Sequence, residues 1–163
     1  MYTSIINYLE KTITLYPEKN AVIDGNKKLT FLELGERAKK VAASIQDFLD
    51  EKRNAPVAVY LDKSEELVVA DIGVSYSGNF FMNLDIKTPK ERIQAILRHI
   101  EPEIIIVDET TREVIDNLLK QENSQTIIMT LETMQNRMLS DVDEINIYNK
   151  LNFQIDTDPS CII

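Results

Sequence analysis

Residues 57–85 read VAVYLDKSEELVVADIGVSYSGNFFMNLD, and the expected arrangement of the rest of the chain follows from them. The apolar runs at 57–61 and 80–84 are rich in β-branched and aromatic residues, which is typical of buried strands. Residues 64–77 between them are apolar on nearly every side, which predicts a buried crossover helix. A strand, a helix and a second strand in this order predict one unit of a parallel sheet.

The same alternation of strands and helices continues toward the carboxyl terminus. Residues 104–107 and 126–129 are short apolar runs that predict two more strands. Residues 131–138 predict one short helix, whereas residues 140–153 are polar and acidic and predict an irregular segment. The sheet is therefore expected to be mostly parallel, with helices on its faces.

Capping signals predict where the two helices after the second strand begin. Thr88 and Glu91 form a capping box that places Pro89 at the first helical position. Thr110 with Glu113 repeats the same device before the next helix.

The amino-terminal part of the chain predicts two helices separated by a hairpin. Residues 5–16 carry an apolar stripe at helical spacing, and residues 21–23 and 28–30 flank a glycine-centred turn. A Thr-x-x-Glu capping box at 30–33 opens a long helix that continues to Leu49. The fold class is thus expected to be α/β: a mostly parallel sheet flanked by helices, layered as in flavodoxin, with a small amino-terminal hairpin.

Composition limits the possible partners and compartments. The chain has 163 residues, 44% of them hydrophobic, which suffices for one core. With 18 basic and 27 acidic side chains its net charge is -9, which disfavours nucleic acids and anionic lipid surfaces as partners. The first residues show neither a signal peptide nor a membrane anchor, and Cys161 is the only cysteine, so a buried thiol in the reducing cytoplasm is expected.

Few residues of this sequence are candidates for chemistry. The four glycines are far apart and form neither a Gly-x-Gly-x-x-Gly motif nor a Walker loop, so no backbone cradle for a triphosphate is evident. Asp62, Asp85 and Asp108 each follow a predicted strand, where carboxylates hold Mg²⁺ in receiver domains or simply cap turns. Capping is the preferred interpretation, because the adjacent acidic pair and late lysine of a receiver domain are missing.

The remaining candidates have simpler interpretations. His99, the only histidine, falls on the polar side of a predicted helix and is expected at the surface. The methionines Met129, Met134 and Met138 are expected to fill the core.

The last residues, Asp158-Pro159-Ser160-Cys161-Ile162-Ile163, predict the start of a buried strand without a following turn or polar tail. Because an apolar run with nothing to cover it is unusual at a domain end, the chain is expected to be a fragment. Such a fragment would expose Cys161, Ile162 and Ile163 or fold them against its own sheet, and self-association through that edge is expected.

Several segments, in order, resemble the AMP-forming adenylate ligases, the superfamily of acyl-CoA synthetases, luciferases and amino-acid adenylation domains. Residues 16–22, Tyr-Pro-Glu-Lys-Asn-Ala-Val, resemble the family's Pro-x-x-x-Ala-Val stretch, and residues 29–34 resemble Leu-Thr-Tyr-x-Glu-Leu. Residues 76–85 resemble Lys-Ala-Gly-x-x-Tyr-x-Pro-x-Asp, with departures at Tyr76, Ser77 and Asn83. Residues 158–163 resemble the strand that leads into the family's phosphate loop.

This resemblance implies a parent enzyme that uses Mg-ATP to convert a carboxylate into an acyl-adenylate and then acylates a thiol. The thiol would belong to coenzyme A or to the phosphopantetheine arm of a carrier protein. Pro89-x-Glu-Arg-Ile93 and Tyr16-Pro17 are closer to amino-acid adenylation domains, including nonribosomal peptide synthetase modules and D-alanine:carrier-protein ligases.

In the resembling family the phosphate donors, the acyl pocket and the mobile lid all lie beyond the segment that corresponds to Ile163. Residues 1–163 are therefore expected to form one amino-terminal subdomain, truncated before the phosphate loop and inactive alone. No catalytic, cofactor-binding or metal-binding residue is expected in it, and its partners would be the missing carboxyl-terminal remainder and a carrier protein. Two alternatives remain open: a stand-alone flavodoxin-like or receiver-like binding or signalling module, and a non-catalytic interaction protein.

Overall fold

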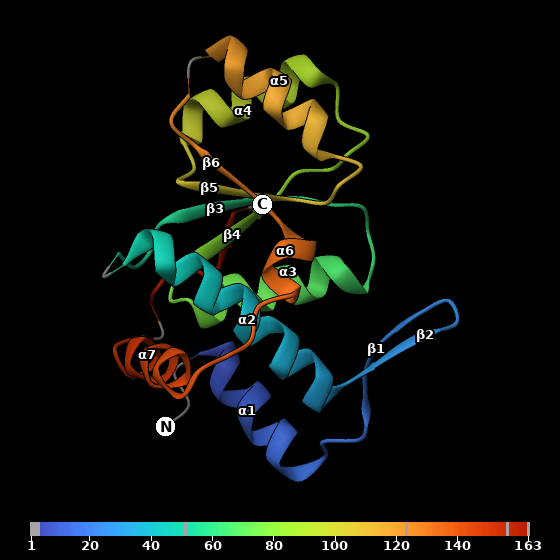
Figure 1. Ribbon diagram of the computed structural model, residues 1–163, viewed down its shortest axis with the longest axis vertical. Helices are drawn as coiled ribbons and strands as arrows, with labels where there is room; N and C mark the ends of the chain where they lie inside the picture. Colours follow the sequence, from blue (N-terminus) through green and yellow to red (C-terminus); the bar gives the residue numbers. More distant parts are fainter. Residues whose placement is uncertain (1–3, 51, 123, 156, 163) are drawn as a thin grey trace.

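The structure, a computed structural model, describes residues 4–50, 52–122, 124–155 and 157–162. Its elements in chain order are shown in Figure 1. They are α1 (Ile5–Leu15), β1 (Asn20–Asp24), β2 (Lys27–Thr30), α2 (Phe31–Leu49), β3 (Pro56–Tyr60), α3 (Glu65–Tyr76), β4 (Phe80–Asn83), α4 (Lys90–Ile100), β5 (Ile104–Val107), α5 (Arg112–Glu122), β6 (Ile127–Thr130), α6 (Leu131–Gln135), α7 (Asp141–Asn152) and β7 (Cys161–Ile162).

The main sheet is parallel throughout, and its strand order is β6-β5-β3-β4-β7. Strand β3 lies at the centre, with Val57 opposite Phe81 of β4 on one side and Ile104 of β5 on the other. Strands β1 and β2 form a separate antiparallel hairpin that extends away from the sheet (Figure 1). These observations confirm the predicted α/β fold with its small hairpin.

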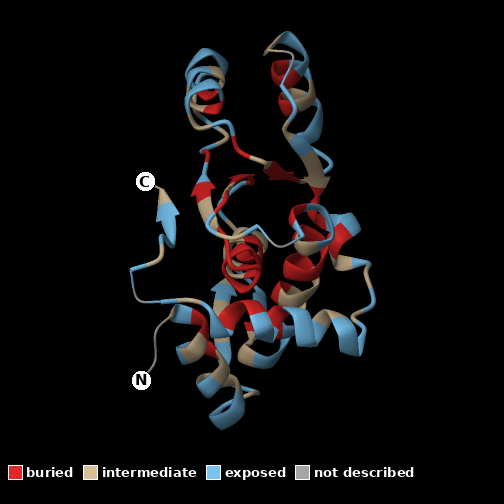
Figure 2. Cartoon of the chain, turned by 90° about the vertical axis from the view of Figure 1, so that its left-hand side faces the viewer, coloured by how far each residue is buried: buried red, intermediate tan, exposed pale blue. Residues whose placement is uncertain are grey.

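Helices cover both faces of the sheet. Val57 and Val59 of β3 pack into a cluster with α1, α2, α3, α6 and α7, whereas Ala58 and Tyr60 pack into a second cluster with α4 and α5. Side chains alternate between the faces of a strand, so a strand covered on both faces needs apolar residues at every position. Figure 2 shows the buried residues concentrated in the central strands and in the helix faces turned toward them.

The start of helix α2 is as predicted. The Thr30 hydroxyl accepts a hydrogen bond from the Glu33 amide at 3.2 Å, and a Glu33 carboxylate oxygen accepts one from the Thr30 amide at 2.8 Å. This reciprocal pair satisfies two of the backbone donors that a helix leaves unpaired at its amino terminus.

The segment predicted to be irregular, residues 140–153, contains helix α7, so that prediction was wrong. The Ser140 hydroxyl accepts a hydrogen bond from the Asp143 amide at 3.2 Å, and Asp143 accepts one from the Ser140 amide at 2.8 Å. Ile147 and Leu151, four positions apart, are buried and anchor the helix on the core. The Ser-x-x-Asp capping box was the signal in the sequence, and the other buried residue of the helix is Lys150.

Two other helix starts differ from the predictions. Pro89 is the cap of α4 and lies outside the helix, with no side-chain capping bond, so the predicted Thr88 box does not form. Before α5 the Thr110 hydroxyl donates to Asp108 at 2.7 Å, and the helix begins only at Arg112. The Asp108 carboxylate accepts hydrogen bonds from Thr110 and Thr111, and it is a stronger acceptor than a threonine hydroxyl. The turn around Asp108 therefore forms in place of the predicted capping box.

The methionine and cysteine predictions were correct only in part. Met134 is buried and Met129 is half-buried, but Met138 is 90% exposed because α6 ends before it, at Gln135. Cys161 is exposed, which corrects the predicted buried thiol: β7 is the outermost strand and pairs with β4. Ile162 is half-buried, and Ile163 lies outside the described residues. Self-association at this edge stays a prediction, which sedimentation velocity over a range of concentrations would test.

Candidate functional site

The carboxyl edge of the sheet is the place where this topology puts a ligand site. The loop after β3 leads to α3 on one face, and the loop after its neighbour β5 leads to α5 on the other face. Where adjacent strands send their connections to opposite faces, a crevice opens at their carboxyl ends, and ligands of open α/β sheets bind there. The carboxyl ends of β3 and β5 are one such place, and those of β3 and β4 are the other, because α4 lies on the same face as α5.

A cleft of about 520 Å³ lies at the ends of β3 and β5. It is lined by Arg37, Leu61, Asp62, Ser64, Glu66, Asp108, Leu131, Glu132, Gln135 and Asn136. Arg37 of α2 is held in place by Glu66 at 2.5 Å and by the side-chain oxygen of Gln135 at 3.2 Å. Sequence reasoning missed Arg37 and Gln135, because they are 98 positions apart and no local pattern marks either.

The charges of this cleft disfavour phosphate groups. Arg37 is the one basic residue among the ten that line it, and four carboxylates accompany it: Asp62, Glu66, Asp108 and Glu132. Because Glu66 already neutralises Arg37, the remaining charge is negative.

The three strand-end aspartates do lie along this edge, but each is engaged in its own turn. One oxygen of Asp62 accepts from the Lys63 amide and one of Asp85 accepts from the Lys87 amide, both at 2.8 Å. Asp62 and Asp85 are exposed, and among the described residues no group of three or more His, Cys, Asp or Glu side chains could hold a metal ion. The geometry thus supports the capping interpretation and gives the receiver-like magnesium site no support.

Asp108 shows the capping role most clearly. Its Oδ1 accepts from the amides of Thr110 at 2.9 Å and Thr111 at 2.7 Å, and from both hydroxyls. Partial burial raises the pKa of this carboxyl, but the hydrogen bonds from Thr110 and Thr111 outweigh burial and leave the pKa below its ordinary value. Asp108 is therefore a structural carboxylate that stays ionised.

The described glycines form no phosphate cradle. Such a cradle holds a triphosphate through consecutive backbone amides of a glycine-rich loop at a helix start. Gly25 lies in the hairpin turn and Gly78 in the turn before β4, whereas Gly35 and Gly73 lie inside α2 and α3. That no residue of this chain binds ATP stays a prediction.

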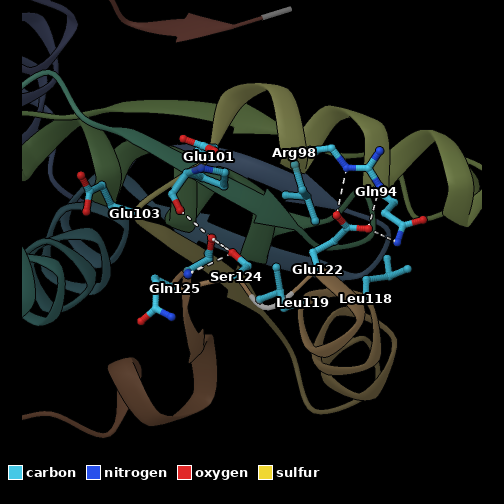
Figure 3. Close-up of a pocket in the computed structure, with 12 residues that line it drawn as sticks. Gln94, Arg98, Glu101, Glu103, Leu118, Leu119, Glu122, Ser124 and Gln125 are labelled. Atoms are coloured by element: carbon cyan, nitrogen blue, oxygen red, sulfur yellow. Dashed lines mark hydrogen bonds and ion pairs between the residues drawn. The ribbon is translucent and has the colours of Figure 1, made fainter.

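A second cavity, of about 370 Å³, lies at the opposite edge of the sheet, between α4 and α5. Figure 3 shows Arg98 and Gln94 of α4 converging on Glu122 of α5. Arg98 donates to both oxygens of Glu122, at 2.9 and 2.7 Å, and Gln94 donates to one of them. The position of the cavity beside the amino ends of the strands indicates a packing gap bridged by an ion pair rather than a ligand site.

The residues that depart from the resembling motif all make contacts within the fold. Tyr76 is fully buried, and its hydroxyl donates to Glu10 of α1. The buried Ser77 hydroxyl donates to the carbonyl of Val74 at 2.7 Å. Asn83 is exposed at the end of β4 and donates to Asp71 of α3 at 2.9 Å. His99, by contrast, is exposed on α4, as predicted.

The Asp71 contact predicts a pH-dependent stability. One carboxylate oxygen of Asp71 is buried without a hydrogen-bond partner among the described residues. Burial raises the pKa of Asp71 and the hydrogen bond from Asn83 lowers it by less, so that together they move the pKa from 3.8 to about 6. The folded chain therefore binds the Asp71 proton more tightly than the unfolded chain, so this carboxyl lowers the free energy of unfolding as the pH rises through that interval.

We expect Asp71→Asn to abolish this loss of stability. At about pH 7 the variant should be more stable than the original chain by roughly 1 kcal/mol, and near pH 4 the difference should vanish. Urea denaturation across this range measures both proteins, and Asp62→Asn controls for the change in net charge. If the difference in stability between the variant and the original chain did not change with pH, the raised pKa of Asp71 would be contradicted.

Comparison with known proteins agrees with this architecture. Residues 9–160 match the family described as AMP-binding enzyme. A D-alanine--D-alanyl carrier protein ligase from Staphylococcus epidermidis is 31% identical over 138 residues, which cover 81% of this chain and 27% of that protein. Bacitracin synthase 1 from Bacillus licheniformis is 27% identical over 157 residues, which cover 96% of this chain and 3% of that protein.

A solved structure shows the same fold. The nonribosomal peptide synthetase FmoA3, in the form bound to α-methyl-L-serine-AMP, superposes with a TM-score of 0.73 at 18% identity, covering 96% of this chain and 16% of that one. The fold is thus that of the amino-terminal α/β layers of adenylation domains. The chain belongs to the AMP-binding enzyme family, and it spans about a quarter or less of the length of these relatives. Among the described residues, no helix is both long and apolar enough to cross a membrane.

Proposed function

We propose that this chain is the amino-terminal part of an ATP-dependent ligase that activates an amino acid as its acyl-adenylate. The carboxylate displaces pyrophosphate from Mg-ATP, and the acyl group then passes to a thiol with release of AMP. The thiol is that of a carrier protein's phosphopantetheine arm or of coenzyme A. The partners of this chain are accordingly the carboxyl-terminal remainder of the enzyme and a carrier protein.

The family match over residues 9–160 carries this proposal. The amino-acid class is supported by the carrier protein ligase that is 31% identical over 81% of this chain, because that ligase is named for D-alanine as its acid. The nonribosomal peptide synthetase FmoA3, which has the same fold and is bound to α-methyl-L-serine-AMP, also supports it.

The role of residues 1–163 in such an enzyme is to build the scaffold. The acidic cleft at the end of β3 and β5 disfavours phosphates, and the described glycines form no phosphate cradle. The donors for the triphosphate are therefore proposed to lie outside this chain. The receiver-like alternative is not favoured, since Asp62, Asp85 and Asp108 cap turns. The contacts that Tyr76, Ser77 and Asn83 make within the fold likewise give no reason to prefer a separate interaction protein.

An exchange assay tests the proposal. Residues 1–163 alone should catalyse no amino-acid-dependent exchange of labelled pyrophosphate into ATP. The protein translated from the reading frame that continues past the Ile163 codon should catalyse it with at least one amino acid of a panel that includes D-alanine.

Three outcomes would count against the proposal. Exchange by residues 1–163 alone would refute the placement of the phosphate site. A stop codon directly after Ile163 would refute the larger enzyme. Exchange that depends on fatty acids and on no amino acid would refute the substrate class.

A further inference from the structure

The turn between α2 and β3 has an unusual backbone. Asp50 and Asn54 both have positive φ angles, of 47° and 54°, although neither is glycine. Left-handed residues of this kind are sparsely populated, and they persist where surrounding contacts require them. Besides a backbone bond from Asn54 to Gly78, this turn contacts a segment about 100 positions later in the chain, the end of α7 and the connection to β7.

Backbone carbonyls of the turn bind a lysine of α7. The Lys150 ammonium donates to the carbonyl of Asp50, and to that of Lys52 at 3.2 Å. Lys150 is only 9% exposed, so the two carbonyls replace most of its hydration. A buried ammonium is retained only where such acceptors face it, so the turn and α7 are held together at this point.

Side chains of the turn bind the segment that precedes β7. Arg53 donates to the carbonyl of Phe153 at 2.7 Å and to Oδ2 of Asp158 at 3.2 Å. Asn54 donates to Oδ1 of the same carboxylate at 3.2 Å. The Asp158 side chain is 18% exposed, and its Oδ2 also accepts from the Ile155 amide at 3.0 Å. Asp158 is thus held by donors on both of its oxygens.

These contacts end two residues before the bond that docks strand β7. The Ser160 carbonyl accepts a hydrogen bond from the Phe81 amide of β4 at 3.3 Å. Strand β7 is short, its Cys161 is exposed, and Ile162 is only half-buried. Little apolar burial therefore holds β7 on the sheet, and the polar contacts at Asp158 gain importance.

We propose that the side chains of Arg53, Asn54, Lys150 and Asp158, with the backbone carbonyls of Asp50 and Lys52, form a clasp that sets the position of strand β7 on the sheet. Arg53 and Asn54 are its positioning residues, and Asp158 is the group that they position. The consequence for catalysis rests on the proposed function together with the family resemblance, which implies that the strand after Asp158 leads to the phosphate loop. A shift of this strand would then displace the loop relative to the rest of the site.

Amide hydrogen exchange measured by NMR on residues 1–163 tests the clasp without any ligase activity. The Phe81 amide reports on the β4–β7 bond, and the Leu84 amide, which donates to the Val59 carbonyl at 2.9 Å, reports on the β4–β3 bond. In Arg53→Ala and in Asp158→Ala we expect the exchange of Phe81 to accelerate at least 10-fold, with Leu84 unchanged. Arg53→Lys keeps the charge and should restore part of the protection.

Lys52→Ala is the matched control. The Lys52 ammonium pairs with Glu103 at 2.9 Å on the surface, outside the clasp, while its carbonyl, which Lys150 uses, is kept in the variant. Phe81 exchange should therefore stay within twofold of the original chain. Three results would each overturn the clasp. The amide exchange of Phe81 and Leu84 could accelerate equally, the exchange of Phe81 could fail to accelerate in Arg53→Ala, or the Phe81 amide could be unprotected in the original chain. Failure of the pyrophosphate exchange assay would leave this result standing and would count only against the proposed function.

Discussion

Gly73→Ala is expected to destabilise the chain by about 2 kcal/mol, although alanine is the better helix former by roughly 1 kcal/mol. Gly73 lies in α3 where this helix crosses α2. A Cβ atom built at this position would come within 2.5 Å of the Val41 side chain and within 2.9 Å of the Ala38 carbonyl oxygen. The carbonyl belongs to the backbone of α2, so the contact is relieved only if the two helices move apart.

Equilibrium urea denaturation measures this effect, and the melting temperature should fall by about 4–8 °C. Gly35→Ala is the matched control, because Gly35 also lies inside a helix and is buried. There the new Cβ would meet the terminal methyl of Ile13 at 2.6 Å, and that flexible side chain can turn aside. We expect Gly35→Ala to change the stability by less than about 0.5 kcal/mol. An equal loss in both variants would contradict the backbone-contact explanation.

Glu10→Ala is expected to lower the free energy of unfolding by about 2–3 kcal/mol. Glu10 accepts from the Tyr76 hydroxyl, from the Lys39 ammonium at 3.0 Å and from the Tyr148 hydroxyl at 3.1 Å. These partners come from α3, α2 and α7, so one carboxylate joins four helices. Its removal leaves Lys39, whose side chain is only 15% exposed, without its counter-charge.

The pKa of Lys39 also shows that the ammonium depends on these partners. Burial lowers this pKa, but the bonds to Tyr148 and Glu10 raise it by more, so the net shift is upward. Glu10→Gln keeps an acceptor oxygen and loses the charge, and it should cost about half as much as Glu10→Ala.

Thermal and urea denaturation compare these variants with Asp116→Ala as control. Asp116 pairs with Lys120 on the exposed face of α5, where the two side chains are 42% and 71% exposed. Such a surface pair contributes about 0.5 kcal/mol or less. If Glu10→Ala costs no more than Asp116→Ala, the cluster does not stabilise the packing of the four helices.

The elements that sequence reasoning located correctly are those whose signals are local. Helix α2 combines a capping box at Thr30 with an apolar stripe, and both features act within a few residues of the chain. Strands β3 and β5 are continuous apolar runs because both faces of each are covered. Helix α7 was missed because only Ile147, Lys150 and Leu151 are buried, which leaves too weak an apolar pattern in an acidic segment.

The candidate site was predictable only at its rim. Asp62 and Asp108 could be placed at the carboxyl edge, because each directly follows a strand. Arg37 and Gln135 could not, since their contact spans 98 positions and depends on how α6 packs against α2. The sequence left two roles open for Asp108, turn capping and metal binding. Only the hydrogen bonds from Thr110 and Thr111 in the structure distinguish them.

The amino-acid sequence alone established the order of the elements, the α/β class and the family resemblance. Its signals were the hydropathy period, the helix caps and the turn residues, which arise from short-range steric and hydrogen-bonding preferences. The four-helix cluster around Glu10, the cleft at Arg37 and the clasp at Asp158 emerged only when distant segments were packed together. Each joins polar groups whose partners are chosen by burial, and burial depends on the whole chain at once. The exposure of Cys161 has the same origin, since an apolar residue at a sheet edge looks like a core residue until the neighbouring strands are in place.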